Sequence, residues 1–213
     1  MHANTRCMEL HSFPSPALKE IDSKYYPVKF NGTLDYPSIY RQDPSPEVDE
    51  AWNRLEDVRI MSISEDDVLK AGKTTDAIQI PQKWGGGYMA SLEVNHQLHC
   101  VNFLRKSLFR DYYQTRSVEF SDHPEMIHTH LLHCVEMLRQ FVMCHADVGV
   151  ITHNWVEDYP RPYPDFNTWH QCRNFENVLQ WAKDHEMQGP PFGPSVHHKW
   201  TPEPGAKIFD SPP

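Results

Sequence analysis

One ten-residue pattern occurs twice in this chain and decides its fold. Its first copy reads His96-Gln-Leu-His99-Cys100-Val-Asn-Phe-Leu-Arg105, and its second copy, 34 residues further along, reads His130-Leu-Leu-His133-Cys134-Val-Glu-Met-Leu-Arg139. That offset leaves room for one helix, a turn and the start of a second helix. We therefore expect two antiparallel helices, related by a pseudo-twofold axis, with the two copies of the pattern face to face.

The spacing of the histidines predicts a metal site at the seam between these helices. Positions i and i+3 of a helix lie roughly 60° apart in projection and about 4.5 Å apart along the axis, so both imidazoles of each copy can turn towards one point. The cysteine that follows points about 100° away from the second histidine. We expect it to form a disulfide or to pack beside the site. The predicted metal ligands are His96, His99, His130 and His133.

The type of ligand narrows the choice of metal. Imidazole suits zinc, copper, iron and nickel, and a nitrogen-rich site favours copper by the usual order of affinities. Zinc is an alternative. Iron usually takes a carboxylate, and Glu93 precedes His96 by three residues, as in the Glu-x-x-His pattern of di-iron bundles. The second copy has Ile127 at the equivalent place, which weakens the case for iron.

Composition excludes some classes of protein. The 213 residues hold 20 Lys and Arg against 29 Asp and Glu, a net charge of −9, and show no basic patch, so we expect no binding to nucleic acid. No run approaches the roughly 20 apolar residues of a membrane span.

The five cysteines form no Cys-x-x-Cys pair. With the sequon Asn31-Gly32-Thr33 they favour an oxidising compartment and two disulfides, with buried thiols as the alternative.

Local patterns predict a mainly α-helical single domain with a few short strands and long proline-rich arms. Prolines make residues 1–50 an extended arm with a short strand at Val28–Phe30. A second strand is expected within 148–156. The Gly85-Gly86-Gly87 run predicts a hinge or tight turn. Helices are expected over 46–59 with Ser45 as N-cap, from Ser64 onwards, over 92–113, over 124–144 with a cap from residues 121–123, and over 173–185.

Several polar residues outside the pattern are candidates for further site residues. We interpret His170 as either an additional ligand or an acid–base group. Asp147 is expected to act in acid–base chemistry or to pair with a repeated arginine. The arginines Arg105 and Arg139 are expected to have a structural role, near helix dipoles or carboxylates such as Asp147 or Glu136.

Around the doubled pattern the chain resembles the UstYa-like family of fungal secondary-metabolite oxidases. The resemblance covers roughly residues 24–187, which we take as the domain, with 1–23 as an N-terminal arm and 188–213 as a Pro/Gly-rich tail. It extends to Phe30-Asn31-Gly32, Pro46–Trp52, the Gly-Gly-Tyr88 approach to the first histidine, Met143–Asp147 and Asp165–Arg173.

The resemblance implies an activity. Members of this family carry out oxidative cyclisation, hydroxylation, desaturation or halogenation of peptides and related natural products, and copper has been implicated. They typically have an N-terminal membrane span and face a secretory lumen. No such span occurs here, so membrane anchoring is expected only through a segment absent from this sequence. By resemblance, the four histidines of the pattern are metal ligands and the nearby cysteines are disulfide partners.

Together these observations predict a copper-dependent oxidase that uses O2 on a small-molecule or peptide natural product. The site would lie between the two helices, partly covered by the aromatic loop 155–169, with His170 and Asp147 as catalytic residues. Two alternatives stay open. One is a non-redox cyclase in which the same pocket folds a reactive substrate. The other is a non-catalytic metal-binding subunit, as a homodimer or paired with a family paralogue.

Overall fold

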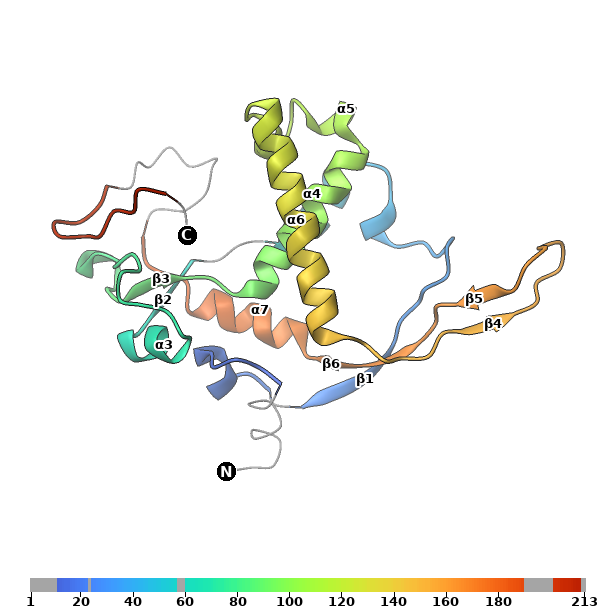
Figure 1. Cartoon of the computed structure of the whole chain (residues 1–213), viewed down its shortest axis with the longest axis horizontal. Coiled ribbons are helices and arrows are strands. Elements are labelled where there is room, and N and C mark those ends of the chain that lie inside the picture. Colours follow the sequence, from blue (N-terminus) through green and yellow to red (C-terminus); the bar gives the residue numbers. More distant parts are fainter. Residues whose placement is uncertain (1–10, 23, 57–59, 190–200, 212–213) are drawn as a thin grey trace. The chain divides into compact units, whose positions relative to one another are not determined.

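The computed structural model describes residues 11–22, 24–56, 60–189 and 201–211. These residues are mainly helical, with short two-stranded sheets (Figure 1), which confirms the predicted fold class. The chain divides into two compact units. Unit 1 comprises residues 1–23, 58–95 and 176–213, and unit 2 comprises residues 24–57 and 96–175. Parts of the expected arm and tail, residues 1–10, 23, 190–200 and 212–213, lie outside the described residues.

Unit 2 contains both copies of the repeated pattern and is built on helices. The helix expected from residue 46 is confirmed, because Pro46 starts it and the Ser45 hydroxyl accepts a hydrogen bond from the Val48 amide at 3.3 Å. The helices and 3-10 turns of this unit are η2 (Ile39–Arg41), α2 (Pro46–Glu56), α4 (Glu93–Leu108), α5 (Arg110–Tyr113), η4 (Val118–Phe120) and α6 (Pro124–His145). The first three residues of α4 belong to unit 1.

Two details of the expected helices are corrected. The helix predicted over 92–113 breaks at Phe109, whose φ and ψ of −119° and 43° are not helical, and this break lets Phe109 pack on the core of unit 2. The cap expected from residues 121–123 makes no side-chain hydrogen bond. His123 occupies the N-cap of α6, and Pro124 takes the first position, where a missing amide hydrogen costs nothing.

The core of unit 2 lies between α4 and α6, which run in opposite directions (Figure 1). Its centre is Phe103, which is fully buried, and the two cysteines of the repeat, which are also fully buried. Apolar burial of this kind supplies most of the free energy that holds helices together. The buried members of the cluster are Cys100, Phe103, Tyr113, Phe120, Ile127 and Cys134.

The two repeated arginines occupy different environments. Arg105 is 9% exposed and donates to the Asn102 side chain at 2.7 Å, to the Tyr113 hydroxyl at 2.8 Å and to Asp49 at 3.1 Å. Burial, followed by the hydrogen bond to Asp49, raises the pKa of Tyr113 to about 12. Its repeat equivalent, Arg139, lies in solvent and forms an ion pair on its own helix. Arg105 therefore ties α2 to α4 and α5, as a structural residue.

The strands of unit 2 form two separate antiparallel pairs. Strand β1 (Tyr25–Lys29) pairs with β6 (Trp169–Arg173), and Val28 lies opposite His170. Strand β4 (Thr152–Asn154), shorter than predicted, pairs with β5 (Tyr163–Asp165).

The β4–β5 hairpin points away from α4 and α6 (Figure 1), and Trp155 at its start is 80% exposed. The expectation that loop 155–169 covers the histidines is therefore wrong, because almost no apolar side chain of the hairpin is buried against the helices.

Unit 1 is organised around the short pair of β2 (Met61–Ile63) and β3 (Tyr88–Ala90). The predicted short helix is α3 (Glu65–Lys70), and the Ser64 hydroxyl caps it by accepting from the Asp67 amide at 3.1 Å. The glycine run is a tight turn with positive φ angles, as expected; a Cβ on Gly87 would meet the Ser62 hydroxyl at 2.3 Å. The other elements are η1 (Pro16–Lys19), η3 (Gln82–Trp84) and α7 (Phe175–Asp184).

A search of the described helices finds none that is both long enough and apolar enough to cross a lipid bilayer.

The core between α4 and α6 yields a stability prediction. Phe103→Ala should lower the free energy of unfolding by about 3–5 kcal/mol, since it removes a large buried ring and leaves a cavity. Leu108→Ala, at a position of the same helix that is 82% exposed, should change it little. Denaturant unfolding followed by circular dichroism measures both variants. Equal losses would contradict the assignment of this core.

Candidate metal centre

The histidines of the repeat face each other in two pairs across the seam between α4 and α6, whereas the pattern predicts that all four can turn towards one point. The ring centroids of His96 and His133 lie 5.5 Å apart, and those of His99 and His130 lie 5.7 Å apart. The first histidine of each copy thus faces the second histidine of the other copy. This crossed pairing is what a local twofold axis between two antiparallel helices produces.

These distances can be compared with those that a bound ion requires. A metal–nitrogen bond of about 2 Å places two imidazole centroids on one tetrahedral ion roughly 5.2 Å apart. Both crossed pairs are close to that value, whereas His130 and His133 are 6.4 Å apart. Within the described residues, no three or more His, Cys, Asp or Glu side chains are gathered closely enough to hold an ion. The ring separations of the two crossed pairs are therefore compatible with two imidazoles on one ion, one pair at a time.

His130 lies beside the apolar core of unit 2. Its centroid lies 4.7 Å from that of Phe103, which belongs to the core. Burial, followed by the nearby His99 and His133, lowers the pKa of His130 below its ordinary value. The folded protein therefore favours the neutral imidazole, which is the form that binds a metal.

Sequence reasoning missed one acidic residue of this site. Glu56, at the end of α2, has a side chain that is only 11% exposed, and its Oε2 lies 3.5 Å from Nδ1 of His99. The other oxygen accepts a hydrogen bond from Asn102 and lies 3.8 Å from the Lys106 ammonium. Oε2 itself is buried without a hydrogen bond. Nothing in the spacing of residues so far apart along the chain pointed to this contact.

The cysteines pack beside the histidines. The Cys100 sulfur lies 3.7 Å from Nε2 of His96. Burial, and then a hydrogen bond with the Cys100 thiol, raises the pKa of Cys134, so the two sulfurs are neighbours across the seam. No disulfide joins any cysteines in the described part of the chain. The expectation that these cysteines pack beside the site without joining its ligands stays a prediction, as does their pairing.

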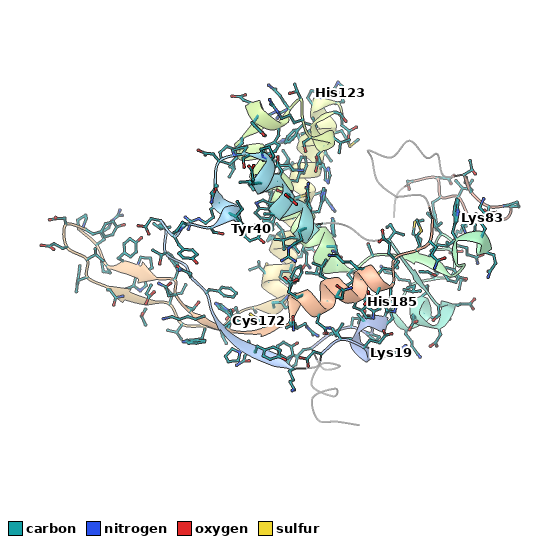
Figure 2. The ribbon with its side chains drawn as sticks, turned by 180° about the vertical axis from the view of Figure 1, so that it is seen from behind. Lys19, Tyr40, Lys83, His123, Cys172 and His185 are labelled. Carbon is teal, nitrogen blue, oxygen red and sulfur yellow. The ribbon has the colours of Figure 1, made fainter. Side chains whose placement is uncertain are left out.

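The other two predicted site residues lie together just beyond the C-terminal end of α6. Figure 2 labels His123 at the opposite end of this helix and Cys172, which follows His170 in β6. Nδ1 of His170 is 2.8 Å from a carboxylate oxygen of Asp147, and Nε2 is 2.8 Å from the Thr168 hydroxyl. Asp147 comes two residues after the end of α6, and that end, His145, is about 18 Å along the helix from His133 at ~1.5 Å per residue. The structure thus brings His170 to Asp147 and does not bring it to the four imidazoles.

A cavity of about 800 Å³ lies within unit 1. It is bounded by residues 75–89 and 201–209 and includes the side chains of Trp84 and Phe209. None of the predicted ligands or catalytic residues lines it. Its size alone gives it no role in the chemistry of the histidines.

Comparisons with known proteins confirm the family resemblance. The family model for the mycotoxin biosynthesis protein UstYa matches residues 1–185. The UstYa family oxidase aprY of Aspergillus flavus is 36% identical over 85% of this chain and 58% of its own length. The UstYa family oxidase phomYc of Diaporthe leptostromiformis is 32% identical over 88% of this chain and 75% of its own length.

One of the similar proteins is named as a transacylase and not as an oxidase. A transacylase, cctO of Talaromyces islandicus, is 26% identical over 92% of this chain and 69% of its own length. No solved structure matches the chain. This chain spans little more than half of the length of the aprY oxidase.

The lowered pKa of His130 predicts a dependence of stability on pH. The unfolded chain binds the proton more readily, so the free energy of unfolding of the metal-free protein should fall as the pH drops below about 6.5, until the lower folded pKa is passed. His130→Gln should reduce this loss between pH 7.5 and pH 5.5. His128→Gln, exposed on the same helix, serves as the control. Denaturant unfolding with a chelator present measures the free energy of unfolding at each pH. The prediction is refuted if this free energy depends on pH equally in His130→Gln and in the parent chain.

Proposed function

Because this chain belongs to the UstYa family of mycotoxin biosynthesis proteins, we propose that it is a metal-dependent oxidase of fungal natural-product biosynthesis. The names of its relatives support an oxidase role. The single observation that carries the proposal is the crossed pairing of the repeated histidines, at 5.5 Å and 5.7 Å, across two antiparallel helices.

We propose copper as the metal, with zinc and iron as less favoured alternatives. The ligands would be His96 with His133, and His99 with His130. Either each crossed pair takes one ion, or the four rings close on a single ion. Copper bound by these rings would supply one-electron chemistry with O2, which removes hydrogen from a substrate C–H or O–H bond.

The residues of the chain prepare this site in two ways. The buried ring of Phe103 excludes water from one side of His130 and keeps that imidazole neutral. Glu56 would accept the Nδ1 hydrogen of His99, which leaves Nε2 as the only lone pair for a ligand bond. Glu56 is in turn held by Asn102 and Lys106. In the metal-bound protein, a carboxylate from another helix would thus orient the side chain of His99.

The proposed substrate is a peptide or related natural product, and the outcomes proposed are oxidative cyclisation, hydroxylation, desaturation or halogenation. We also propose that the protein works in a secretory lumen, with the repeat cysteines Cys100 and Cys134 as a disulfide and a glycan on the exposed Asn31. Association with a second copy or a family paralogue belongs to the same proposal.

A second candidate is a non-redox cyclase, and the 2.8 Å contact between His170 and Asp147 favours it. A histidine held by a carboxylate can take or give a proton without any metal. A third candidate is a metal-binding subunit that has no activity of its own. If the protein is a non-redox cyclase, product forms without O2 or metal. If it is a metal-binding subunit, the isolated chain turns over no substrate.

The test of the oxidase proposal combines metal analysis with oxygen consumption. The purified protein, loaded with copper(I), should bind copper tightly, give a copper(II) signal in electron paramagnetic resonance after exposure to air, and consume O2 with a peptide substrate. His99→Ala and His133→Ala should weaken copper binding by about a hundredfold, as loss of a ligand does. His128→Ala is the matched control on α6. Unchanged copper affinity in both ligand variants would refute the proposal.

The role of Glu56 gives a separate prediction. Glu56→Gln should lower copper affinity by roughly 10- to 100-fold, because it weakens the partner that orients His99. Glu136→Gln, which makes the same change at an exposed carboxylate within the second copy of the repeat, is the control. Competition titration with a chelator measures both. If Glu56→Gln and Glu136→Gln bind copper as tightly as the parent chain, Glu56 has no part in orienting the ligand.

A further inference from the structure

Three side chains near the end of α6 form a chain of hydrogen bonds that the proposed oxidase chemistry does not use. The Thr168 hydroxyl lies 2.8 Å from Nε2 of His170, and Nδ1 of that ring lies 2.8 Å from the Asp147 carboxylate. Hydroxyl, imidazole and carboxylate are thus arranged in the order of nucleophile, base and orienting acid. The two ring nitrogens have the partners that this order requires.

We propose that Thr168 is the nucleophile of a second catalytic site, which accepts an acyl group from an activated ester and passes it to water or an amine. His170 is the general base of this site, and Asp147 orients it. The site needs no metal and no oxidant. It lies about 18 Å along α6 from His133, so it goes beyond the proposed oxidase function and does not depend on it.

The backbone holds the nucleophile in place. The Phe30 amide donates to the Thr168 carbonyl at 2.8 Å, and the Thr168 amide donates to the Phe166 carbonyl at 3.0 Å. In extended chain, residues i and i+2 point to the same face, which places the Thr168 hydroxyl beside the ring of His170. The ring of Phe30 stacks on that of His170 with centroids 3.8 Å apart. The base is therefore fixed by packing as well as by its hydrogen bonds.

The carboxylate is positioned by the end of α6. Ala146 adopts a left-handed conformation with φ of 38°, which is unfavourable for a residue with a Cβ and turns the chain out of the helix. The Gly149 amide then donates to Asp147 at 2.7 Å. This bond, followed by the one to His170, lowers the pKa of Asp147. An ionised Asp147 holds the hydrogen on Nδ1 and leaves Nε2 free to accept the proton of the hydroxyl.

The site is open to a substrate from solution. The side chain of Asp147 is 60% exposed and that of His170 is 19% exposed. An ester can therefore approach the hydroxyl without movement of a buried core.

The proposed step balances without a co-reactant. The Thr168 oxygen attacks the ester carbonyl carbon while its proton passes to Nε2 of His170. The carbon–oxygen bond to the leaving alcohol then breaks, and that alcohol leaves with the proton from the imidazole. Water or an amine next attacks the acyl–threonine ester, gives a proton to Nε2, and releases the acid or amide. The threonine oxygen regains the proton, and nothing is oxidised or reduced.

The experiment uses the full chain, treated with a chelator, and p-nitrophenyl acetate as the acyl donor. We expect a burst of nitrophenol and an added mass of about 42 Da on the peptide that contains Thr168. Thr168→Val should abolish that label, and Thr168→Ser should restore it. Thr152→Val, an exposed threonine of β4, is the matched control. His170→Gln should slow acylation by about a hundredfold or more, and its rate should lose the dependence on a histidine pKa.

Circular dichroism and copper affinity are measured on each variant, because neither should change in Thr168→Val. Acetyl label that appears only on lysines or histidines, or at Thr168 at equal rates in the parent chain and in His170→Gln, would overturn the proposal. The oxidase proposal is judged on copper and oxygen in the same preparations, so failure of one leaves the other standing.

Discussion

The packing of α4 against α6 is the constraint on which the rest of unit 2 depends. Phe103, Cys100 and Cys134 are buried without solvent exposure at this interface, and burying them sets the rotation of both helices. A rotation of one residue, about 100°, would turn the histidines away from each other. The crossed pairing of the imidazoles is therefore a consequence of apolar packing, and any metal chemistry inherits its geometry from it.

Two copies of one pattern have acquired unequal surroundings. Arg105 is buried in a polar network with α2 and α5, whereas Arg139 is in solvent. His99 lies next to Glu56, whereas its equivalent in the second copy, His133, forms no ion pair with a carboxylate within the described residues. The ligands thus obey an approximate twofold axis and their partners do not. Such inequality lets two imidazole pairs differ in affinity or redox behaviour while sharing one scaffold.

The same helix connects the two proposed sites. The middle of α6 provides His130, which lies beside the apolar core in a setting that favours the neutral imidazole. Its C-terminal end delivers Asp147 to His170 in a more exposed setting, where a hydroxyl is within reach. Because the helix is rigid and α6 runs from Pro124 to His145, these two regions stay separate. A small domain can hold an oxidative site and a site for acyl chemistry in this way.

Much of the local structure follows from sequence alone. The repeated histidines are three residues apart, which is a helical spacing, and Ser45, Pro46 and Ser64 are start signals whose effect is confined to one turn. The break at Phe109 escaped prediction, because the helical pattern continues through it and only packing on the core ends α4 there.

The doubled pattern by itself determined that two helices would present four imidazoles and two cysteines in matching positions, because helical periodicity acts over a few residues. Only the tertiary structure decided that Glu56 would lie against His99, and that Thr168 would join His170 and Asp147. Those contacts join segments whose approach depends on how helices and strands pack, and no spacing along the chain encodes that distance.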